Sequence, residues 1–189
     1  MTAFSQFVRS SALGRWGLAV TLLLVFAAVL APWLARFDPN AQDLPARLAS
    51  PSAAHWMGTD ELGRDIFSRL LFGARVSMLV GSSVVLGCGL IGLALGSLAG
   101  YFGGWFDRLI NVVLINSFLS FPGILLAIAF AAVLGPGIGK VILALVITGW
   151  AGYARLARAQ VLKTKELEYV LAARSLGASH LRILARHLL

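Results

Sequence analysis

Long apolar runs bounded by basic residues dominate this sequence. The first run lies between Arg15 and Arg36. About 20 helical residues, at roughly 1.5 Å each, span a hydrocarbon core of roughly 30 Å. Runs of this kind, free of charged residues, lie at 16–35, 76–106, 109–139 and 141–154. The pattern predicts an all-α fold, a polytopic membrane helical bundle with four spans.

Two of these runs leave alternatives open. The fourth run, between Lys140 and Arg155, is short for a span. It reaches full length only if the flanking basic side chains snorkel toward the interfaces. The first run follows Arg9 and Arg15, as the apolar part of a signal peptide would. Its length exceeds the usual signal segment, which favours a retained helix.

The composition supports a membrane protein. Hydrophobic residues make up 59% of the chain and charged residues 13%, which lies outside the soluble range. The net charge is +8, but the basic residues bracket the apolar runs instead of covering a soluble face, so we expect no nucleic-acid partner. The single cysteine, Cys88, permits no disulfide within the chain.

The distribution of Lys and Arg predicts a cytoplasmic N-terminus. In that orientation, ten of the 16 basic residues lie on the cytoplasmic side and six lie outside. The positive-inside rule favours this arrangement. It also places the basic segment after Arg155 in the cytoplasm.

The loop after the first span carries its own pattern. Thr59 or Asp60 is a plausible N-cap, and the apolar residues of 66–71 share one helical face. We therefore expect a short helix at the outer interface. The acidic and basic residues around Asp60 suit either a soluble outer partner or a solvated cap on the bundle.

Glycine and proline mark the interior of two spans. Gly92, Gly96 and Gly100 repeat every four residues, which leaves a stripe without side chains where another helix can approach closely. Pro122, in the third run, removes a backbone hydrogen bond and predicts a kink. A polar cluster in the same run, from Asn111 to Ser120, faces a pore or bonds to neighbouring helices.

The sequence offers no catalytic or cofactor chemistry. It has no metal-ligand spacing, no nucleophile beside a base and no glycine loop for phosphates. We therefore expect neither an enzyme nor a bound cofactor. Ionisable residues are missing from the middle of every predicted span, which disfavours an ion-coupled carrier.

A basic amphipathic segment follows the last apolar run. Residues 164–176 have a helical pattern with Glu166 and Glu168 in the first turn, where carboxylates favour the helix dipole. Gly177 suits a left-handed helix stop, and Ser179 suits the N-cap of a second helix. Two interpretations remain open: the hairpin docks on another protein, or it lies against anionic lipid headgroups.

Several motifs, in order along the chain, resemble one protein family. The segment 168–189 resembles the cytoplasmic coupling loop, or EAA loop, of binding-protein-dependent ABC importer permeases. Segments similar to the dipeptide, oligopeptide and nickel subfamily, and within it to the C-type subunit of a heterodimer, lie at 58–65, 72–77, 98–105 and 149–155.

The resemblance implies a function and a set of partners. It implies a bacterial inner-membrane permease that moves substrate by alternating access, driven by ATP hydrolysis on separate subunits. The implied partners are a second permease subunit, two ATP-binding subunits, an extracytoplasmic solute-binding protein and membrane lipid. Short peptides are the expected substrate. A nickel importer, or a non-transporting scaffold with a lipid-binding hairpin, is the alternative.

The resemblance also assigns residues and domains. The residues that it implies for ATPase coupling are Glu168, Ala172, Ala173, Arg174 and Gly177. The motif's glutamate falls on Leu171, for which Glu168 is a loose substitute. We expect an N-terminal region at 1–75 and an incomplete permease domain at 76–189, with coupling helices at about 164–189. The family has six spans, so the chain is expected to be truncated after the coupling loop.

Overall fold

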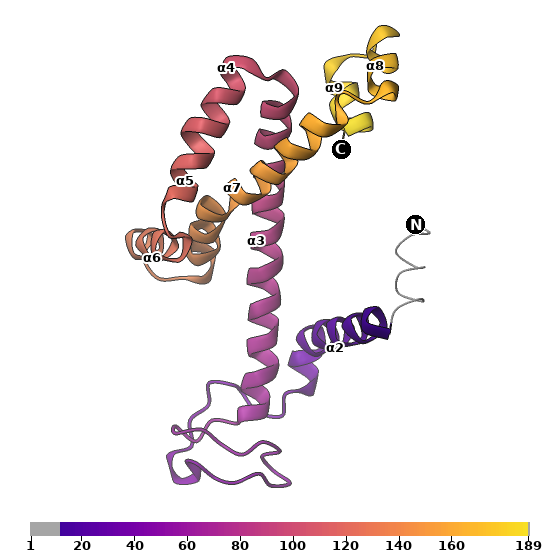
Figure 1. Ribbon diagram of the computed structural model, residues 1–189. Coiled ribbons are helices and arrows are strands. Elements are labelled where there is room, and N and C mark those ends of the chain that lie inside the picture. The colour runs from indigo at the N-terminus through magenta and orange to yellow at the C-terminus, as the bar shows by residue number, and fades with distance from the viewer. Residues whose placement is uncertain (1–11, 189) are drawn as a thin grey trace. The chain divides into compact units, whose positions relative to one another are not determined.

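The computed structural model describes residues 12–188. Arg9, from the orientation argument, and Leu189 lie outside the described residues. The described part is mainly helical and is drawn in Figure 1. Its helices are α2 (Ala12–Leu34), η1 (Leu44–Ala46), α3 (Ile66–Phe102), α4 (Gly104–Asp107), η2 (Arg108–Ile115), α5 (Asn116–Ser120), α6 (Gly123–Leu134), α7 (Ile138–Thr164), α8 (Glu168–Ser175), α9 (His180–Ile183) and η3 (Leu184–Leu188).

Within the described residues, three helices are long and apolar enough to cross a membrane: α2, α3 and α7. The helical segments 104–120 and 123–134 pass the same test together but are bent by 85°, so they count as a fourth if the pair is one span. The expected all-α membrane protein with up to four spans is confirmed.

The last span differs from the sequence prediction in length. The charge-free run 141–154 is only the middle of α7, which has 27 residues and continues through Arg155 and Arg158. Charge does not stop a helix, and Arg158 has an acidic partner on another helix. The limits of a charge-free run therefore underestimate the length of the helix.

The chain divides into two compact units, residues 1–81 and 82–189. Helix α3 contributes its first part to one unit and its second part to the other. The first unit holds α2, the loop 35–65 and the start of α3.

The loop between α2 and α3 is closed by a short turn. Thr59 and Asp65 form an antiparallel bridge, and the Thr59 hydroxyl donates a hydrogen bond to the backbone oxygen of Ala46. Asp65 Oδ2 accepts the backbone N–H of Ser68 at 2.8 Å, so Asp65 caps the start of α3. The predicted N-cap at Thr59 or Asp60 is wrong, because both residues belong to the turn.

The predicted short interfacial helix is also corrected. Residues 66–71 are the first turns of the 37-residue helix α3, which continues without a break to Phe102. No proline lies between 71 and 76, the single glycine Gly73 does not break the helix, and Arg75 interrupts only the charge-free run.

The carboxyl group of Asp65 is buried and held by several groups. His55 Nδ1 lies 3.0 Å from Asp65 Oδ1, and the His55 ring stacks on Phe37 with 4.6 Å between centroids. Burial alone would raise the pKa of Asp65. The hydrogen bonds from Ser68 and His55 outweigh that effect, and the pKa is lowered.

A second carboxylate, that of Asp60, lies at the surface of the same loop and forms ion pairs there. Its Oδ2 lies 2.8 Å from Arg64 Nε and 3.4 Å from an Arg69 guanidinium nitrogen. Burial would raise the pKa of Asp60, but the backbone hydrogen bonds from Arg64 and Leu62, together with the Arg64 charge, lower it. Asp60 therefore pairs with Arg64 in the same loop and with Arg69 in the first turns of α3.

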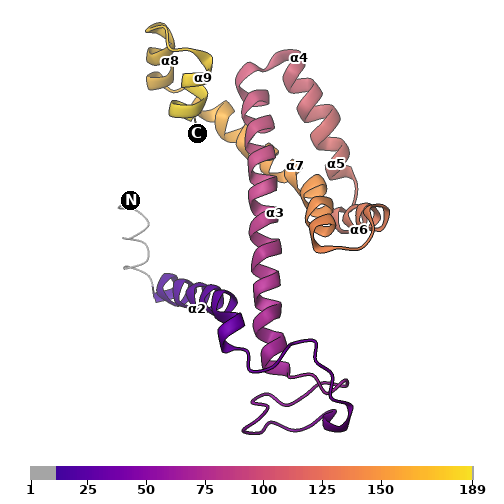
Figure 2. The same ribbon diagram turned by 180° about the vertical axis from the view of Figure 1, so that it is seen from behind.

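In the second unit, α7 crosses the later part of α3, as the two opposite views in Figures 1 and 2 agree. Small side chains form much of its buried core. Ala99 on α3 and Ala151 and Ala154 on α7 are fully buried, together with Ile115 and the nearly buried Trp150. Close packing of small residues is the usual basis of helix association in lipid.

Candidate functional site

The candidate site is the segment 165–188, which follows α7. The connection begins with a turn at Lys165 to Leu167, and α8 then starts at Glu168. Glu168 lies in the first turn of α8, as expected, whereas Glu166 precedes the helix. The prediction of one helix from 164 is therefore wrong by about one turn, because the chain forms a turn before the extended Leu167.

Helix α8 ends at the predicted glycine. Gly177 has φ +81°, and its N–H donates to the oxygen of Arg174 at 3.0 Å. The N–H of Ala178 donates to the oxygen of Ala173, also at 3.0 Å. This pair of hydrogen bonds is the Schellman arrangement, which favours glycine because its left-handed residue carries no Cβ.

Helix α9 begins at His180, three positions after Gly177. Ser179 Oγ accepts the backbone N–H of Arg182 at 3.4 Å, which confirms the predicted N-cap. Two large apolar side chains are exposed here, Leu176 at the end of α8 by 89% and Leu181 in α9 by 77%. We call residues 168–183 the tip. Large exposed apolar side chains in one small segment are typical of a protein or membrane contact.

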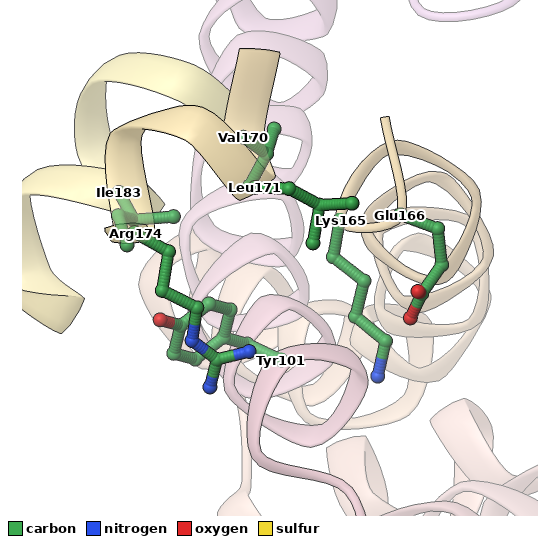
Figure 3. A pocket seen from close by; sticks show the side chains of 7 residues that line it. All are labelled: Tyr101, Lys165, Glu166, Val170, Leu171, Arg174 and Ile183. Carbon is green, nitrogen blue, oxygen red and sulfur yellow. The ribbon is translucent and has the colours of Figure 1, made fainter. Parts of the chain in front are cut away.

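The inner side of the tip packs against the end of α3. Val170 and Ile183 are buried, and with Tyr101 they line a cavity that Lys165 and Arg174 also border (Figure 3). In that view the Arg174 side chain extends across the Tyr101 ring, and Lys165 lies to the right of it. The Lys165 ammonium donates a hydrogen bond to the oxygen of Gly100 at 3.0 Å.

The five residues that the resemblance implies for coupling all lie on α8 or its stop. Glu168, Ala172, Arg174 and Gly177 are exposed, and Ala173 is half-buried. Leu171 is exposed on its outer side and borders the same cavity as Arg174. The structure therefore places these residues within one short, largely accessible segment.

The glycine stripe of α3 faces α7. A Cβ added at Gly92 would lie 2.8 Å from the backbone nitrogen of Ala154, and one added at Gly96 would lie 2.9 Å from the Ala154 Cα. A Cβ at Gly100 would lie 2.9 Å from the Arg158 oxygen. The two backbones are close enough at these three positions that any side chain on α3 would have to displace one of them.

An ion pair joins α7 to α4 beside this contact. Arg158 donates hydrogen bonds to both carboxylate oxygens of Asp107, at 2.5 and 2.6 Å. One turn away, Arg155 donates to the side-chain oxygen of Asn116 at 3.2 Å. Of the two interpretations of the polar cluster, bonding to a neighbouring helix therefore applies to Asn116.

The bend between α5 and α6 lies at Pro122. The residue before it, Phe121, is extended with φ −92° and ψ 144°, and α6 begins immediately after Pro122. Proline disfavours a helical conformation for the residue before it, which accounts for the helix break at Phe121. The two helical segments meet there at 85°.

Two family models match this chain. The model described as "Binding-protein-dependent transport system inner membrane component" matches residues 92–189, which is more than half of the chain. The chain belongs to this family. A second model, "N-terminal TM domain of oligopeptide transport permease C", matches residues 3–51. The predicted membership of the importer permeases is therefore confirmed.

Proteins named as transport permeases are similar to this chain over most of its length. The chain is 45% identical over 170 residues to a probable D,D-dipeptide transport system permease of Escherichia coli K12, covering 90% of this chain and 57% of that protein. It is 42% identical to a dipeptide transport permease of Bacillus subtilis, covering 96% and 57%. A nickel transport permease of E. coli K12 is 43% identical, with 92% and 62% covered.

The chain thus spans about three-fifths of the length of these permeases. They are named as transport permeases, in agreement with the expectation of a membrane transport component and not an enzyme. The family places the chain in the inner membrane.

Sequence reasoning missed three long-range polar contacts of this permease domain. These are Arg158 with Asp107, Lys165 with Gly100 and Tyr101 with His180. The pattern assigns Arg158 and Lys165 only to the basic segment that follows the last apolar run. Asp107, which lies between the runs 76–106 and 109–139, is the available signal for an ion pair.

Proposed function

We propose that this chain is the permease subunit of an ATP-driven, binding-protein-dependent importer, and that its tip docks on an ATP-binding subunit. The observation that carries the proposal is the turn at Gly177. It holds Leu176 and Leu181 exposed, while Val170 and Ile183 anchor the inner side of the tip. Such an element has one face fixed to its own domain and one face available to a partner.

Small residues on α8 fit a close contact. Ala172 is exposed and Ala173 is half-buried. Because neither carries a long side chain, a partner's backbone could approach the helix closely there. Glu168 and Arg174 add one charge of each sign at the edges of this surface. Leu171, at the position of the family motif's glutamate, makes the surface more apolar.

The first test substitutes the most exposed apolar side chain of the tip. Leu176→Asp should strongly weaken capture of the ATP-binding subunits, because a charge would have to be desolvated in the docked state. Since Leu176 is 89% exposed, the fold of the chain should be unaffected. The matched control is Leu44→Asp, at a leucine that is 58% exposed in the α2–α3 loop. Equal capture by both variants would contradict the proposed docking surface.

A second substitution tests the alanine surface of α8. Ala173→Glu places a long charged side chain on a half-buried position of the tip. We expect normal membrane insertion and reduced ATPase binding, measured by co-purification. Unchanged co-purification would show that the partner does not approach α8 at this position.

The remaining partners and the orientation belong to the same proposal. A second permease subunit would complete a heterodimer, two ATP-binding subunits would supply the energy, and a solute-binding protein would deliver substrate. The N-terminus would be cytoplasmic, as the excess of Lys and Arg on that side favours. Cysteine labelling from each side of the membrane, at a position in 35–65 and at one in the tip, tests this topology.

Short peptides are the proposed substrate. The support comes from the relatives that are named for dipeptide transport, whereas the similar nickel permease supports the alternative. Uptake of a labelled dipeptide and of nickel, in a strain lacking the intact importer, separates the two.

A non-transporting scaffold with a lipid-binding hairpin is the second candidate, and the basic residues of 155–186 favour it. Neighbouring genes for a second permease and two ATP-binding subunits would support the importer. Their absence, together with binding of the tip to anionic vesicles, would support the scaffold.

A further inference from the structure

Helix α9 is tied to the end of α3 through His180. The ring nitrogen Nδ1 of His180 lies 2.7 Å from the hydroxyl oxygen of Tyr101, across 79 positions of sequence. The same ring packs against Tyr101 and Phe102, with centroid distances of 5.6 and 6.0 Å. A phenol can donate to Nδ1 or accept from it, so this hydrogen bond forms with either tautomer of the ring.

The local structure presents His180 to this contact. It is the first residue of α9, and Ser179 caps that helix, so the backbone at His180 is held by the turn itself. Tyr101 belongs to the last turn of α3, directly after Gly100. The capped start of α9 and the last turn of α3 therefore meet at one hydrogen bond.

The hydrogen bond between Tyr101 and His180 is the last in a series of contacts between α3 and the helices that follow it. The glycine contact with α7 reaches as far as Gly100, and the Lys165 ammonium bonds to the oxygen of that residue. His180 then adds a link from α9, on the far side of the Gly177 turn. Lys165 and His180 thus hold the segments on both sides of α8 to the last turn of α3.

We propose that His180 is a positioning residue for energy coupling, which transmits a displacement of the tip to α3 through Tyr101. This inference rests on the proposed docking of the tip on an ATP-binding subunit. Without the Tyr101–His180 hydrogen bond, the tip can move while α3 stays in place. Less substrate is then transported for each ATP that is hydrolysed. Because one hydrogen bond at an exposed residue is lost, we expect a two- to tenfold decrease in substrate transported per ATP.

The test uses the complete importer in proteoliposomes, with ATP hydrolysis and uptake of a labelled dipeptide measured on the same sample. Tyr101→Phe removes only the hydroxyl and keeps the ring. We expect normal binding of the ATP-binding subunits and a two- to tenfold lower ratio of transport to hydrolysis. His180→Leu should give the same result, and His180→Asn, which can place a polar atom near the position of Nδ1, should restore most of the ratio.

A double variant separates coupling from a general loss of structure. If the two side chains act through their hydrogen bond, Tyr101→Phe combined with His180→Leu should be no worse than either change alone. Hydrogen exchange of 168–183 in the variant chain should also be faster, with exchange in α2 unchanged. An unchanged ratio in Tyr101→Phe, or a purely additive double variant, overturns the role of His180. Failure of the wild-type chain to bind the ATP-binding subunits would instead refute the proposed function itself.

Discussion

The close contact between α3 and α7 makes a sharp prediction for Gly96. In Gly96→Ala, the new Cβ would meet the backbone of Ala154, with Cα and C both at 2.9 Å and the oxygen closer still. None of these atoms can rotate away, so the two helices must separate. The matched control is Gly89→Ala on the same helix, where a Cβ would meet nothing within 4 Å.

The two variants isolate the steric effect. Each gains about 1 kcal/mol in helix propensity when alanine replaces glycine, so this contribution cancels in the comparison. Overpacking costs about 1–3 kcal/mol, and the backbone position of the obstacle at Gly96 favours the upper half of that range. We therefore expect Gly96→Ala to be about 2–3 kcal/mol less stable than Gly89→Ala, which corresponds to a factor of roughly 30 to 150 in the unfolding equilibrium.

The assay is reversible unfolding of the purified chain in mixed micelles, titrated with sodium dodecyl sulfate and followed by tryptophan fluorescence. Trp150 is nearly buried in the α3–α7 core and reports on this contact. Equal stability of the two variants would refute the close approach of α3 and α7. A large loss in Gly89→Ala would show that the glycine stripe faces a different neighbour.

Three further predictions concern polar and backbone contacts. Arg158→Met should destabilise the chain by about 1–3 kcal/mol, because the half-buried carboxylate of Asp107 loses both of its hydrogen bonds. In a double-mutant cycle, adding Asp107→Asn should recover part of this loss. Asp65 has a lowered pKa in the fold. Its contribution to stability is therefore complete above the unfolded pKa of about 3.8 and is lost as the pH falls from there through the lower folded pKa, and Asp65→Asn should remove this pH dependence of hydrogen exchange in 35–65. Gly177→Ala should cost roughly 1–2 kcal/mol, because alanine disfavours φ +81°, and should speed exchange in α8 without affecting α6.

Local patterns in the sequence predict local structure well in this chain. The left-handed stop at Gly177 and the cap at Ser179 each depend on one residue type at one position, and both are present. Helix limits are predicted less well. The pattern assigns the first turns of α3 to a separate short helix because Arg69 and Arg75 interrupt the apolar run, although a helix tolerates charge on a face that reaches solvent.

Contacts between distant segments were outside the reach of these patterns. Nothing in the periodicity around Tyr101 or His180 specifies that a phenol and an imidazole meet, because the contact depends on how α3, α7 and α9 are packed. The same holds for Asp107 and Arg158, which lie 51 positions apart. The charged residues were visible in the sequence, but their partners follow from tertiary structure alone.

The way the tip is held bears on the choice between a protein partner and a lipid surface. A hairpin that binds headgroups needs its cations free to reach phosphate. Lys165 instead directs its ammonium to the oxygen of Gly100, and Arg174 borders the cavity that contains Tyr101 (Figure 3). Among the large apolar side chains of the tip, Leu176 at the end of α8 and Leu181 in α9 are the most exposed. An apolar turn on a firmly attached base favours a protein groove, where apolar surface is buried and the attachment to α3 resists the force that the partner applies.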